Sequence, residues 1–508
     1  MSELFRKIAP VADELGELFA ARGYQIALVG GSVRDVFLGR IGNDLDLTTD
    51  ARPETVLELV RDWADSIWTI GIDFGTVGVR KGGWLLEITT YRSESYDPKS
   101  RKPDVAYGDT LEGDLARRDF AVNAMALRLP SREFVDPHGG LDDLHAKVLR
   151  TPGPPERSFG DDPLRMLRAA RFASQLGFAV DPAALAAMGA MADRIDIVSA
   201  ERIREELDKL IGGDHPREGL RLLVESGLAD HVLPEVPKLR LEIDEHHRHK
   251  DVYEHSLIVL EQAIDLEESG PDRILRWAAL LHDVGKPKTR RHEPGGRVSF
   301  HHHEVVGAQL ARKRMAELKF PKDVVADVSR LVELHLRFHG YGTGEWTDSA
   351  VRRYVRDAGH LLERLHKLTR ADCTTRNRRK AQALSQTYDQ LEERIARLAE
   401  EEELGKIRPE LDGNEIQELL GVPPGPLVGR AYKFLLEMRL DQGVLGKEAA
   451  SDALREWARA NGVDGVAAVT GRIGVVSGVS GVGGIGGIGG IGGEVGEVAG
   501  EVDSERRS

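Results

Sequence analysis

The chain has 508 residues, of which 41% are hydrophobic and 30% are charged, and its formal net charge is −14. This composition indicates an ordinary globular chain of several domains, and the acidic balance argues against a protein that coats nucleic acid with its whole surface. A local basic groove stays open, because basic clusters occur within residues 352–356 and 367–380.

The single cysteine, Cys373, excludes an intramolecular disulfide framework and fits a reducing compartment. Residues 3–21 have helical periodicity and lack the continuous apolar core of a signal peptide. Before the glycine-rich C-terminal tail, no apolar run is long enough to span a bilayer. We therefore expect a cytoplasmic protein without a membrane partner.

The first motif follows a short apolar run, residues 26–29, which predicts a buried strand. This run ends in Gly30-Gly31, and Ser32 can cap a short helix, so backbone N–H groups could meet an anion there. In Asp44-Leu45-Asp46-Leu47 polar and apolar residues alternate, and a strand would point both carboxylates to one face. Two such carboxylates, Asp44 and Asp46, are the hard oxygen ligands that Mg²⁺ prefers.

Paired carboxylates on a strand fit nucleotidyl transfer, in which divalent ions activate a hydroxyl and neutralise a triphosphate. The chain contains no G-x-x-x-x-G-K-[ST] sequence, which excludes a P-loop. Two aspartates alone would more often mark a solvated strand face. However, G-G-S-V-R-D from Gly30 to Asp35, followed by Asp44-x-Asp46, resembles the first motif of the class II tRNA nucleotidyltransferase and bacterial poly(A) polymerase superfamily.

The next apolar runs, residues 66–70, 76–80 and 84–90, are broken by glycines and predict a small mixed sheet. Glu87 lies in the third run and could approach the two aspartates, although an exposed strand glutamate is more common. Residues 91–110 are polar and contain two prolines, which predicts a mobile loop.

The second motif is R-R-D-F-A-V-N-A from Arg117 to Ala124. If it is helical, Asp119 and Asn123 lie one turn apart and could present an acceptor and an amide to a ribose, with Arg118 toward phosphate. An ordinary polar helix face is the alternative. In the resembling superfamily this motif is assigned to recognition of ribose rather than deoxyribose, and the chain matches it in full.

The third motif begins at Asp162-Pro163, which predicts a helix start with an aspartate cap. The i, i+3, i+6 spacing of Arg165, Arg168 and Arg171 places them on one side of this helix, while Leu164, Leu167 and Phe172 can face the core. Three guanidinium groups beside a carboxylate suit a triphosphate and the edge of a base, and a solvated basic stripe is the alternative.

This third segment resembles the nucleotide-selecting motif of the superfamily. The resemblance implies that Asp162 and Arg165 read the base edges of CTP and ATP, with Arg168 and Arg171 toward phosphate. One residue departs from the pattern, because Asp161 stands where the family usually has glutamate. The later segment 201–207 resembles a further helical motif, for which we expect a structural role.

A fourth cluster combines histidines and aspartates from separate expected helices: His255, His282, Asp283 and Asp372. Such a set favours a transition metal such as Ni²⁺, Mn²⁺ or Fe²⁺, and His282-Asp283 with Gly285-Lys286-Pro287 resembles the HD phosphohydrolase superfamily. An isolated His-Asp pair usually has no function, but further histidines strengthen the interpretation: His246, His247, His249, His301, His302, His303 and His335. Of these, His303 and His335 are the best candidates for contacting a substrate or a second metal.

These patterns predict an α+β fold in which a small mixed sheet is followed by a helical body. The expected domains are a nucleotidyltransferase head at 1–150, a helical neck with the nucleotide-selecting motif at 151–240, a helical HD domain at 241–400, a helical tRNA-binding region at 401–464 and a tail at 465–508. The tail is a repeat of glycine, valine and isoleucine, for which we predict disorder.

The resemblance runs from about Tyr24 to Trp457 and implies a class II tRNA nucleotidyltransferase with an internal HD domain. The terminal hydroxyl of tRNA would attack the α-phosphate of CTP or ATP, release pyrophosphate and build the 3′-terminal CCA. Asp44 and Asp46 would bind Mg²⁺. The residues that would hold the nucleotide are Gly31, Arg34, Arg118, Asp119, Asn123, Asp162, Arg165, Arg168 and Arg171.

Three alternatives stay open. Poly(A) polymerases share the head motifs but tend to carry Gly-Arg-Arg-Phe where this chain has Gly71-Ile72-Asp73-Phe74, which favours the tRNA enzyme. An enzyme that adds only CC or only A is the second alternative, and the retained segment 91–110 weighs against the CC-only form. The third is an HD phosphodiesterase or phosphatase whose head only binds RNA, which intact Asp44 and Asp46 disfavour.

Overall fold

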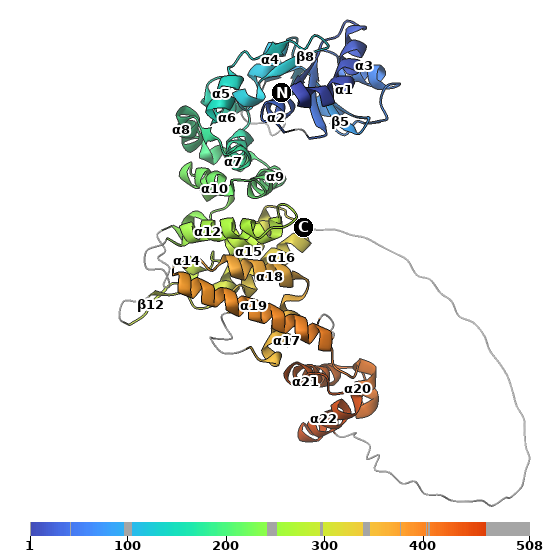
Figure 1. Cartoon of the computed structure of the whole chain (residues 1–508), viewed down its shortest axis with the longest axis vertical. Coiled ribbons are helices and arrows are strands. Elements are labelled where there is room, and N and C mark those ends of the chain that lie inside the picture. The colour runs from blue at the N-terminus through green and yellow to red at the C-terminus, as the bar shows by residue number, and fades with distance from the viewer. Residues whose placement is uncertain are drawn as a thin grey trace, which may run out of the picture. The chain divides into compact units, whose positions relative to one another are not determined.

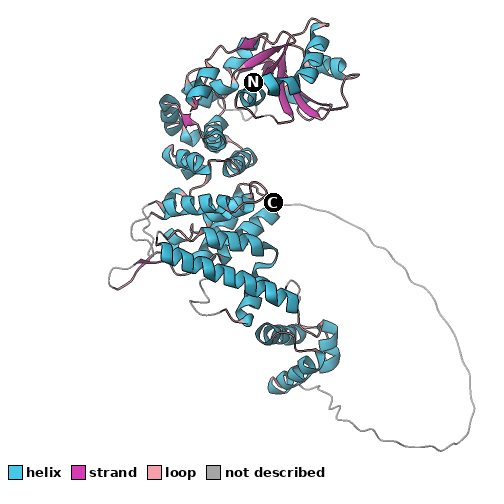
Figure 2. Cartoon of the chain, in the orientation of Figure 1, coloured by secondary structure: helices cyan, strands magenta, loops and turns pink. Residues whose placement is uncertain are grey.

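The computed structural model describes residues 2–40, 42–95, 104–240, 251–294, 298–338, 346–375, 377–402, 404 and 407–463. The described residues form two compact units, of which the first lies within residues 2–410 with Phe434–Gly446 and the second holds Leu411–Lys433 and residues 447–463. The predicted α+β fold is confirmed. Figure 2 shows most strands gathered in the head, while helices dominate the rest of the described chain.

The head is built on a seven-stranded sheet in the order β3-β4-β5-β2-β1-β8-β9. Strands β2 and β5 are parallel and the other pairs are antiparallel, so the sheet is mixed, as expected. Its strands are β1 (Ile26–Val29), β2 (Asp44–Thr49), β3 (Ser66–Trp68), β4 (Thr76–Lys81), β5 (Trp84–Thr90), β8 (Ala126–Leu129) and β9 (Phe134–Val135).

Burial on the two faces of the sheet explains these strands. All four residues of β1 are buried, and Ile26 and Leu28 belong to the main core while Ala27 and Val29 belong to a smaller core that includes Leu111. Helix α1 (Ser2–Ala20) contributes an apolar stripe, whose described members are Ile8, Ala12, Leu15 and Phe19. The other head helices are α2 (Gly31–Phe37), α3 (Pro53–Val60), α4 (Leu111–Ala116) and α5 (Gly140–Ala146).

Two expectations for the head are wrong. The segment 91–110 is not only a loop, since β6 (Arg92–Ser95) pairs with β7 (Asp104–Tyr107) as an antiparallel hairpin, whereas residues 96–103 lie outside the described part. The second motif is not an α-helix, because α4 ends at Ala116 and only the 3-10 helix η2 (Ala121–Asn123) follows. The Asp119 carboxylate explains this local fold, since Oδ1 accepts a hydrogen bond from the Phe120 backbone N–H at 2.8 Å.

The neck is mostly helical, and its short strand β11 (Ala179–Val180) pairs in parallel with β10 (Val148–Leu149) from the end of the head. Its helices are α6 (Pro155–Asp161), α7 (Leu164–Leu176), α8 (Pro182–Ala190), α9 (Ala200–Ile211), α10 (Pro216–Glu225) and α11 (Leu228–Val232). Helix α7 packs against α9 and α10 (Figure 1). The helix that carries the third motif therefore packs against two other helices.

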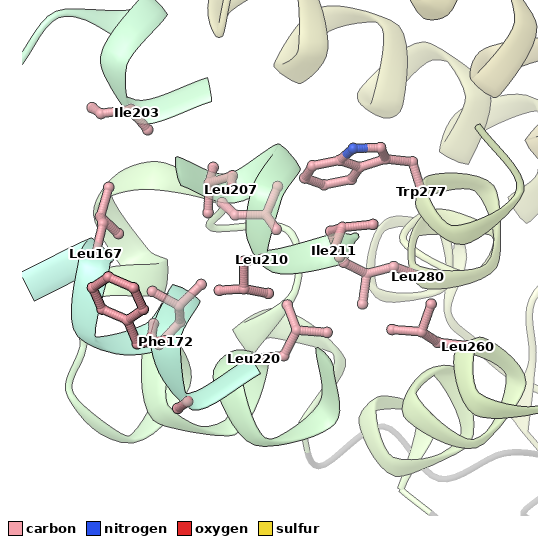
Figure 3. Packing of buried hydrophobic residues seen from close by; sticks show 14 of the residues in the cluster. Leu167, Phe172, Ile203, Leu207, Leu210, Ile211, Leu220, Leu260, Trp277 and Leu280 are labelled. Carbon is pink, nitrogen blue, oxygen red and sulfur yellow. The ribbon is translucent and has the colours of Figure 1, made fainter. Parts of the chain in front are cut away.

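The HD region continues this core. In Figure 3 the apolar side chains of α7 and α9 form a row that reaches Trp277 and Leu280 on α13 and Leu260 on α12. The helices of this region are α12 (Val252–Asp265), α13 (Arg273–Leu281), α14 (Lys286–Thr289), α15 (His303–Glu317), α16 (Lys322–Leu334), α17 (Asp348–Ala358), α18 (Leu362–Ala371) and α19 (Arg378–Glu401). A short hairpin joins β12 (Arg291–His292) to β13 (Val298–Ser299).

Three helices follow, α20 (Gly413–Leu420), α21 (Pro426–Gln442) and α22 (Lys447–Ala460). Helix α20 begins with a reciprocal capping box between Asp412 and Glu415. Among the helices of the described residues, none is both long and apolar enough to cross a membrane. The predicted disordered tail lies outside the described residues.

Candidate active sites

Three carboxylates meet on one face of the head sheet. In β2 the side chains of Asp44 and Asp46 are exposed while Leu45 and Leu47 are buried, which confirms the predicted alternation. Glu87 on β5 is the partner of Asp46 in the parallel register, so its side chain shares this face.

Burial and mutual repulsion raise the pKa values of two of these carboxylates, Asp46 and Glu87. Burial raises the pKa of Asp46, the charge of Asp44 adds to the increase, and Arg118 opposes it. Burial likewise raises the pKa of Glu87, with further increases from Asp46 and Asp44. A divalent cation would relieve this repulsion, so the oxygen donor set fits the metal expected here.

The glycine turn before α2 lets Arg118 approach the carboxylates. Gly30 has φ 67°, and a Cβ at this position would stand 3.0 Å from a terminal nitrogen of Arg118 and 3.6 Å from Asp46 Oδ2. The prediction that Ser32 caps this helix is wrong. Its hydroxyl instead accepts a hydrogen bond from Asp46 N at 2.8 Å. The serine instead fixes the strand that carries the aspartates.

The second motif forms a buried polar chain that ends on α7. Arg34 donates to Asn123 Oδ1 at 2.7 Å, Asn123 Nδ2 donates to Asp119 Oδ1 at 3.0 Å, and Arg168 Nε donates to Asp119 Oδ2 at 2.7 Å. Burial alone would raise the pKa of Asp119, but Arg168 and the hydrogen bonds hold it well below its usual range. Asp119 and Asn123 thus lie together as expected, although the backbone between them forms a 3-10 turn and not the expected α-helix.

The arginines of the third motif do not form a solvated stripe. Arg165 and Arg171 are buried, and Arg165 donates to the Ser158 carbonyl and hydroxyl oxygens and to the Arg117 carbonyl. Asp162 supports the helix start, since its Oδ1 accepts from Leu164 N at 3.1 Å. Both proposed base-reading residues therefore have fixed positions.

Sequence reasoning missed three supports of this helix. The guanidinium groups of Arg34, Arg168 and Arg171 lie 5.2, 5.6 and 4.2 Å from the ring centroid of Phe172, which also packs edge-on against Phe120. Two further ion pairs, each 3.0 Å long, join Arg171 to Glu206 and Asp162 to Arg202. Burial lowers the pKa of Arg171 to about 10, with a further decrease from Arg168. The only sequence signal for Arg202 and Glu206 was the resemblance of the segment 201–207 to a helical motif.

One cavity of about 1300 Å³ is lined by residues of all three motifs. Its lining includes every residue predicted for the transferase site: Gly31, Arg34, Asp44, Asp46, Arg118, Asp119, Asn123, Asp162, Arg165, Arg168 and Arg171. The lining also holds Phe74, Thr76, Glu87 and Thr89 from the other side of the aspartates. A cavity with carboxylates beside several arginines can hold a metal-bound triphosphate.

The HD residues form a second, buried site. His255 on α12, His282 after α13 and Asp372 after α18 bring their ligand atoms together, and His255 Nε2 lies 3.3 Å from His282 Nε2 and 3.0 Å from Asp372 Oδ1. Asp283, His303 and His335 form a neighbouring group, in which His303 Nε2 lies 3.2 Å from Asp283 Oδ1.

Asp283 links the two groups, because its other oxygen, Oδ2, lies 3.2 Å from His282 Nε2. Lys286 Nζ is also 2.8 Å from this oxygen. Burial would raise the pKa of Asp283, but His282 and Lys286 hold it well below its usual range. A carboxylate between two imidazole groups fits a bridging metal ligand.

Backbone contacts orient the imidazole rings for this role. The Nδ1 atoms of His282, His303 and His335 lie 2.7 to 2.8 Å from the carbonyl oxygens three residues earlier, so each ring directs Nε2 toward the carboxylates. The buried Nε2 atoms of His303 and His335 make no well-aligned hydrogen bond within the described part of the chain. Two imidazole nitrogens that face a carboxylate without a well-aligned hydrogen bond fit metal ligation.

The remaining features predicted from the sequence are further histidines and the basic clusters. His301 and His302 are exposed, and His246, His247 and His249 lie outside the described residues. Members of the basic clusters are ion-paired within the chain, since Arg352 pairs with Glu402 and Arg353 with Glu437.

Family models match three parts of the chain. Residues 26–150 match the family model of the poly A polymerase head domain, residues 177–239 match a probable RNA and SrmB-binding site of polymerase A, and residues 252–403 match the HD domain. The chain is 36% identical over 354 residues to an A-adding tRNA nucleotidyltransferase of Deinococcus radiodurans, an alignment that covers 68% of this chain and 80% of that protein.

Two further proteins are similar to the chain. It is 41% identical over 233 residues to a CCA-adding enzyme of Lactobacillus helveticus, which covers 46% of this chain and only 56% of that enzyme. The solved structure of the Bacillus stearothermophilus CCA-adding enzyme in complex with CTP superposes with a TM-score of 0.65 and 25% identity, covering 91% of this chain and 99% of that one.

Proposed function

Because the chain belongs to the tRNA nucleotidyltransferase family, we propose that it adds the 3′-terminal CCA to tRNA from CTP and ATP, with release of pyrophosphate. One observation carries the proposal: a single cavity joins the carboxylates of β2 to the arginines of α2 and α7. The enzymes compared are tRNA-processing proteins, which favours tRNA over poly(A) synthesis.

Asp44, Asp46 and Glu87 would hold the metal, for which we propose Mg²⁺ because all three are hard oxygen donors. When bound, it supplies charge neutralisation and activation of the attacking hydroxyl. Arg34, Arg118 and Arg168 would bind phosphate oxygens.

The base of the incoming nucleotide would face Asp162 and Arg165 at the start of α7. Arg165 is fixed by Ser158 and the Arg117 carbonyl, and Asp162 by Leu164 N and Arg202. Rigid donors and acceptors can choose between base edges, because a mismatched base leaves them unpaired.

A specialised A-adding enzyme is the second candidate, since the Deinococcus radiodurans relative, which spans most of the chain, bears that name. The test uses purified full-length protein and tRNA transcripts that end before CCA, after the first C and after the second C. Each transcript is incubated with CTP alone and with ATP alone. CCA addition predicts C on the first two and A on the third. An A-adding enzyme extends only the third, and repeated adenylation of all three would contradict both readings.

We propose a second activity for the HD residues, a metal-dependent phosphohydrolase that uses Ni²⁺, Mn²⁺ or Fe²⁺. The supporting observation is the pair of ligand groups joined by Asp283, because imidazole and carboxylate together suit these metals. Metal analysis of carefully prepared protein, followed by assay of 2′,3′-cyclic phosphate cleavage, tests it. Protein without a bound transition metal would make the cluster structural.

A further inference from the structure

The transferase cavity extends to both sides of the two aspartates. In the sheet order β4-β5-β2-β1, strand β1 with its glycine turn lies on one side of β2, and β5 followed by β4 lies on the other. The residues that would bind the nucleotide come from the β1 side and from α7. The β5 and β4 side contributes a different set of lining residues: Phe74, Thr76, Glu87 and Thr89.

Phe74 is unusual among these residues because it is a large apolar side chain left in contact with water. It is 55% exposed and lines the cavity, and in the described structure it does not join the main hydrophobic core. Its backbone is held at the end of the 3-10 helix η1 (Ile72–Phe74), where Gly75 adopts φ 79° and donates to the Ile72 carbonyl. The ring therefore has a fixed support without a partner in the core.

The neighbouring threonines continue this side of the cavity. Thr76 and Thr89 face one another across β4 and β5, and their hydroxyl oxygens lie 2.9 Å apart. Thr89 is two residues from Glu87 on the same strand face, so a group resting on the threonines would stand next to the carboxylates.

This half of the cavity suits the second reactant. The attacking hydroxyl and the nucleotide phosphate must approach the same metal-bearing carboxylates, and Arg34, Arg118 and Arg168 lie on the phosphate side. Arg92 lies on the other side, where it donates to Thr76 Oγ1 at 3.2 Å. Unpaired RNA ends are bound by stacking of their bases on aromatic side chains, which accept any base because every base has a π-face. CCA synthesis needs this tolerance, since the acceptor ends in the last base of the transcript before the first addition and in cytosine before the next two.

We propose that Phe74 is a binding residue for the RNA acceptor and stacks against its 3′-terminal base. The proposal rests on the transferase function proposed above. It commits the β5 and β4 side of the cavity to the RNA end, and the α7 side to the incoming nucleotide.

The test uses the full-length chain and an RNA minihelix of the tRNA acceptor arm that carries 2-aminopurine at its 3′ terminus. Stacking quenches the fluorescence of this base, and the measurement needs no CTP or ATP. We expect quenching by the wild-type protein, loss of most of it in Phe74→Ala, and recovery in Phe74→Trp. In addition assays, Phe74→Ala should raise the KM for RNA about tenfold while the KM for CTP changes less than about twofold.

Ile70 provides the matched control, because it is 92% exposed on the same connection but does not line the cavity. Ile70→Ala should behave like wild type in both assays. Quenching that survives Phe74→Ala would overturn the inference and assign the base to another ring, such as the half-buried Trp68 that packs over Gly78. An equal rise of both KM values would also overturn it, since that indicates a general disturbance of the cavity.

The two proposals fail in different ways. If wild-type protein quenches the minihelix but adds no nucleotide to any transcript, the transferase function fails while the contact stands. If addition is normal and Phe74→Ala matches wild type, only the acceptor contact fails.

Discussion

The transferase cavity and the HD cluster offer a metal ion opposite surroundings, one open and one closed. Asp44 and Asp46 share the open face of one short strand, and partial burial, with a further increase from the charge of Asp44, raises the pKa of Asp46. His282 and Asp283 are each 1% exposed, and imidazole groups and Lys286 keep Asp283 charged. An open carboxylate site can exchange a hard cation and admit a large substrate, whereas a closed imidazole site retains its metal and admits small groups.

The two sites also differ in how the chain assembles them. The aspartates of β2 need only the local period of a strand, whereas the HD ligands come from five helices between His255 and Asp372. Damage to the HD site should therefore leave the transferase chemistry intact, and the reverse should also hold. The following experiments test this independence.

The largest effect is expected for Asp44→Asn or Asp46→Asn. Either change removes a metal-binding charge from the cavity, so nucleotide addition should fall about a thousandfold or more, while phosphohydrolase activity and circular dichroism stay unchanged. Single-turnover addition to a tRNA transcript measures the first quantity. A folded variant with near-normal addition would remove these residues from the site.

His282→Ala combined with Asp283→Ala should abolish binding of the transition metal and lower hydrolysis of a 2′,3′-cyclic phosphate by about a hundredfold or more. CCA addition should stay close to that of wild type. His302→Ala is the matched control, because this side chain is 84% exposed beside His303. Loss of both activities in a folded double variant would show that the sites are not separable.

A smaller effect is expected for Arg165→Ala. Removal of one base-edge partner should reduce the preference for CTP and ATP over UTP and GTP by about tenfold. The change also leaves the Arg117 and Ser158 carbonyls without this donor, so the free energy of unfolding should fall by about 1 to 3 kcal/mol.

The control for Arg165→Ala is Ser158→Ala, which removes only the hydroxyl that Arg165 contacts. This variant should keep its nucleotide preference. If Arg165→Ala keeps it too, base reading belongs to other residues and Arg165 acts only as a support.

The last prediction is a change in the free energy of unfolding that depends on pH. The pKa of Asp119 is lowered in the folded chain, so this carboxylate stabilises the fold at pH values above its ordinary pKa, and the contribution is lost as pH falls toward the lower folded value. Asp119→Asn should therefore cost about 2 kcal/mol near pH 7, and the difference from wild type should shrink below about pH 4. Urea unfolding across pH measures it, and a constant difference would contradict the role of the Asp119 to Arg168 pair.

The parts of the transferase site that were predictable depend only on local sequence patterns. The alternation of Asp44 to Leu47 requires only a strand, and the i, i+3, i+6 spacing of Arg165, Arg168 and Arg171 requires only a helix. The placement of Glu87 beside Asp46 depends on the register between β2 and β5, which no local pattern specifies.

The errors came from side chains that compete with regular structure. The Asp119 carboxylate accepts backbone and side-chain donors and replaces the expected α-helix by a single 3-10 turn. Phe172 lies in the core as expected, but the spacing did not indicate that its ring also contacts three arginines. Ion pairs such as Arg171 with Glu206 join segments far apart in the chain, so sequence spacing carries no signal for them.

The central claim is that the cavity around Asp44 and Asp46 completes the tRNA 3′ end. The most direct measurement is 3′-end sequencing of a transcript lacking CCA, after incubation with purified protein, CTP, ATP and Mg²⁺. We expect extended molecules to end in CCA and to grow no further, and we expect Asp44→Asn protein to give none. Unextended transcripts with folded wild-type protein, or long adenosine tails, would contradict it.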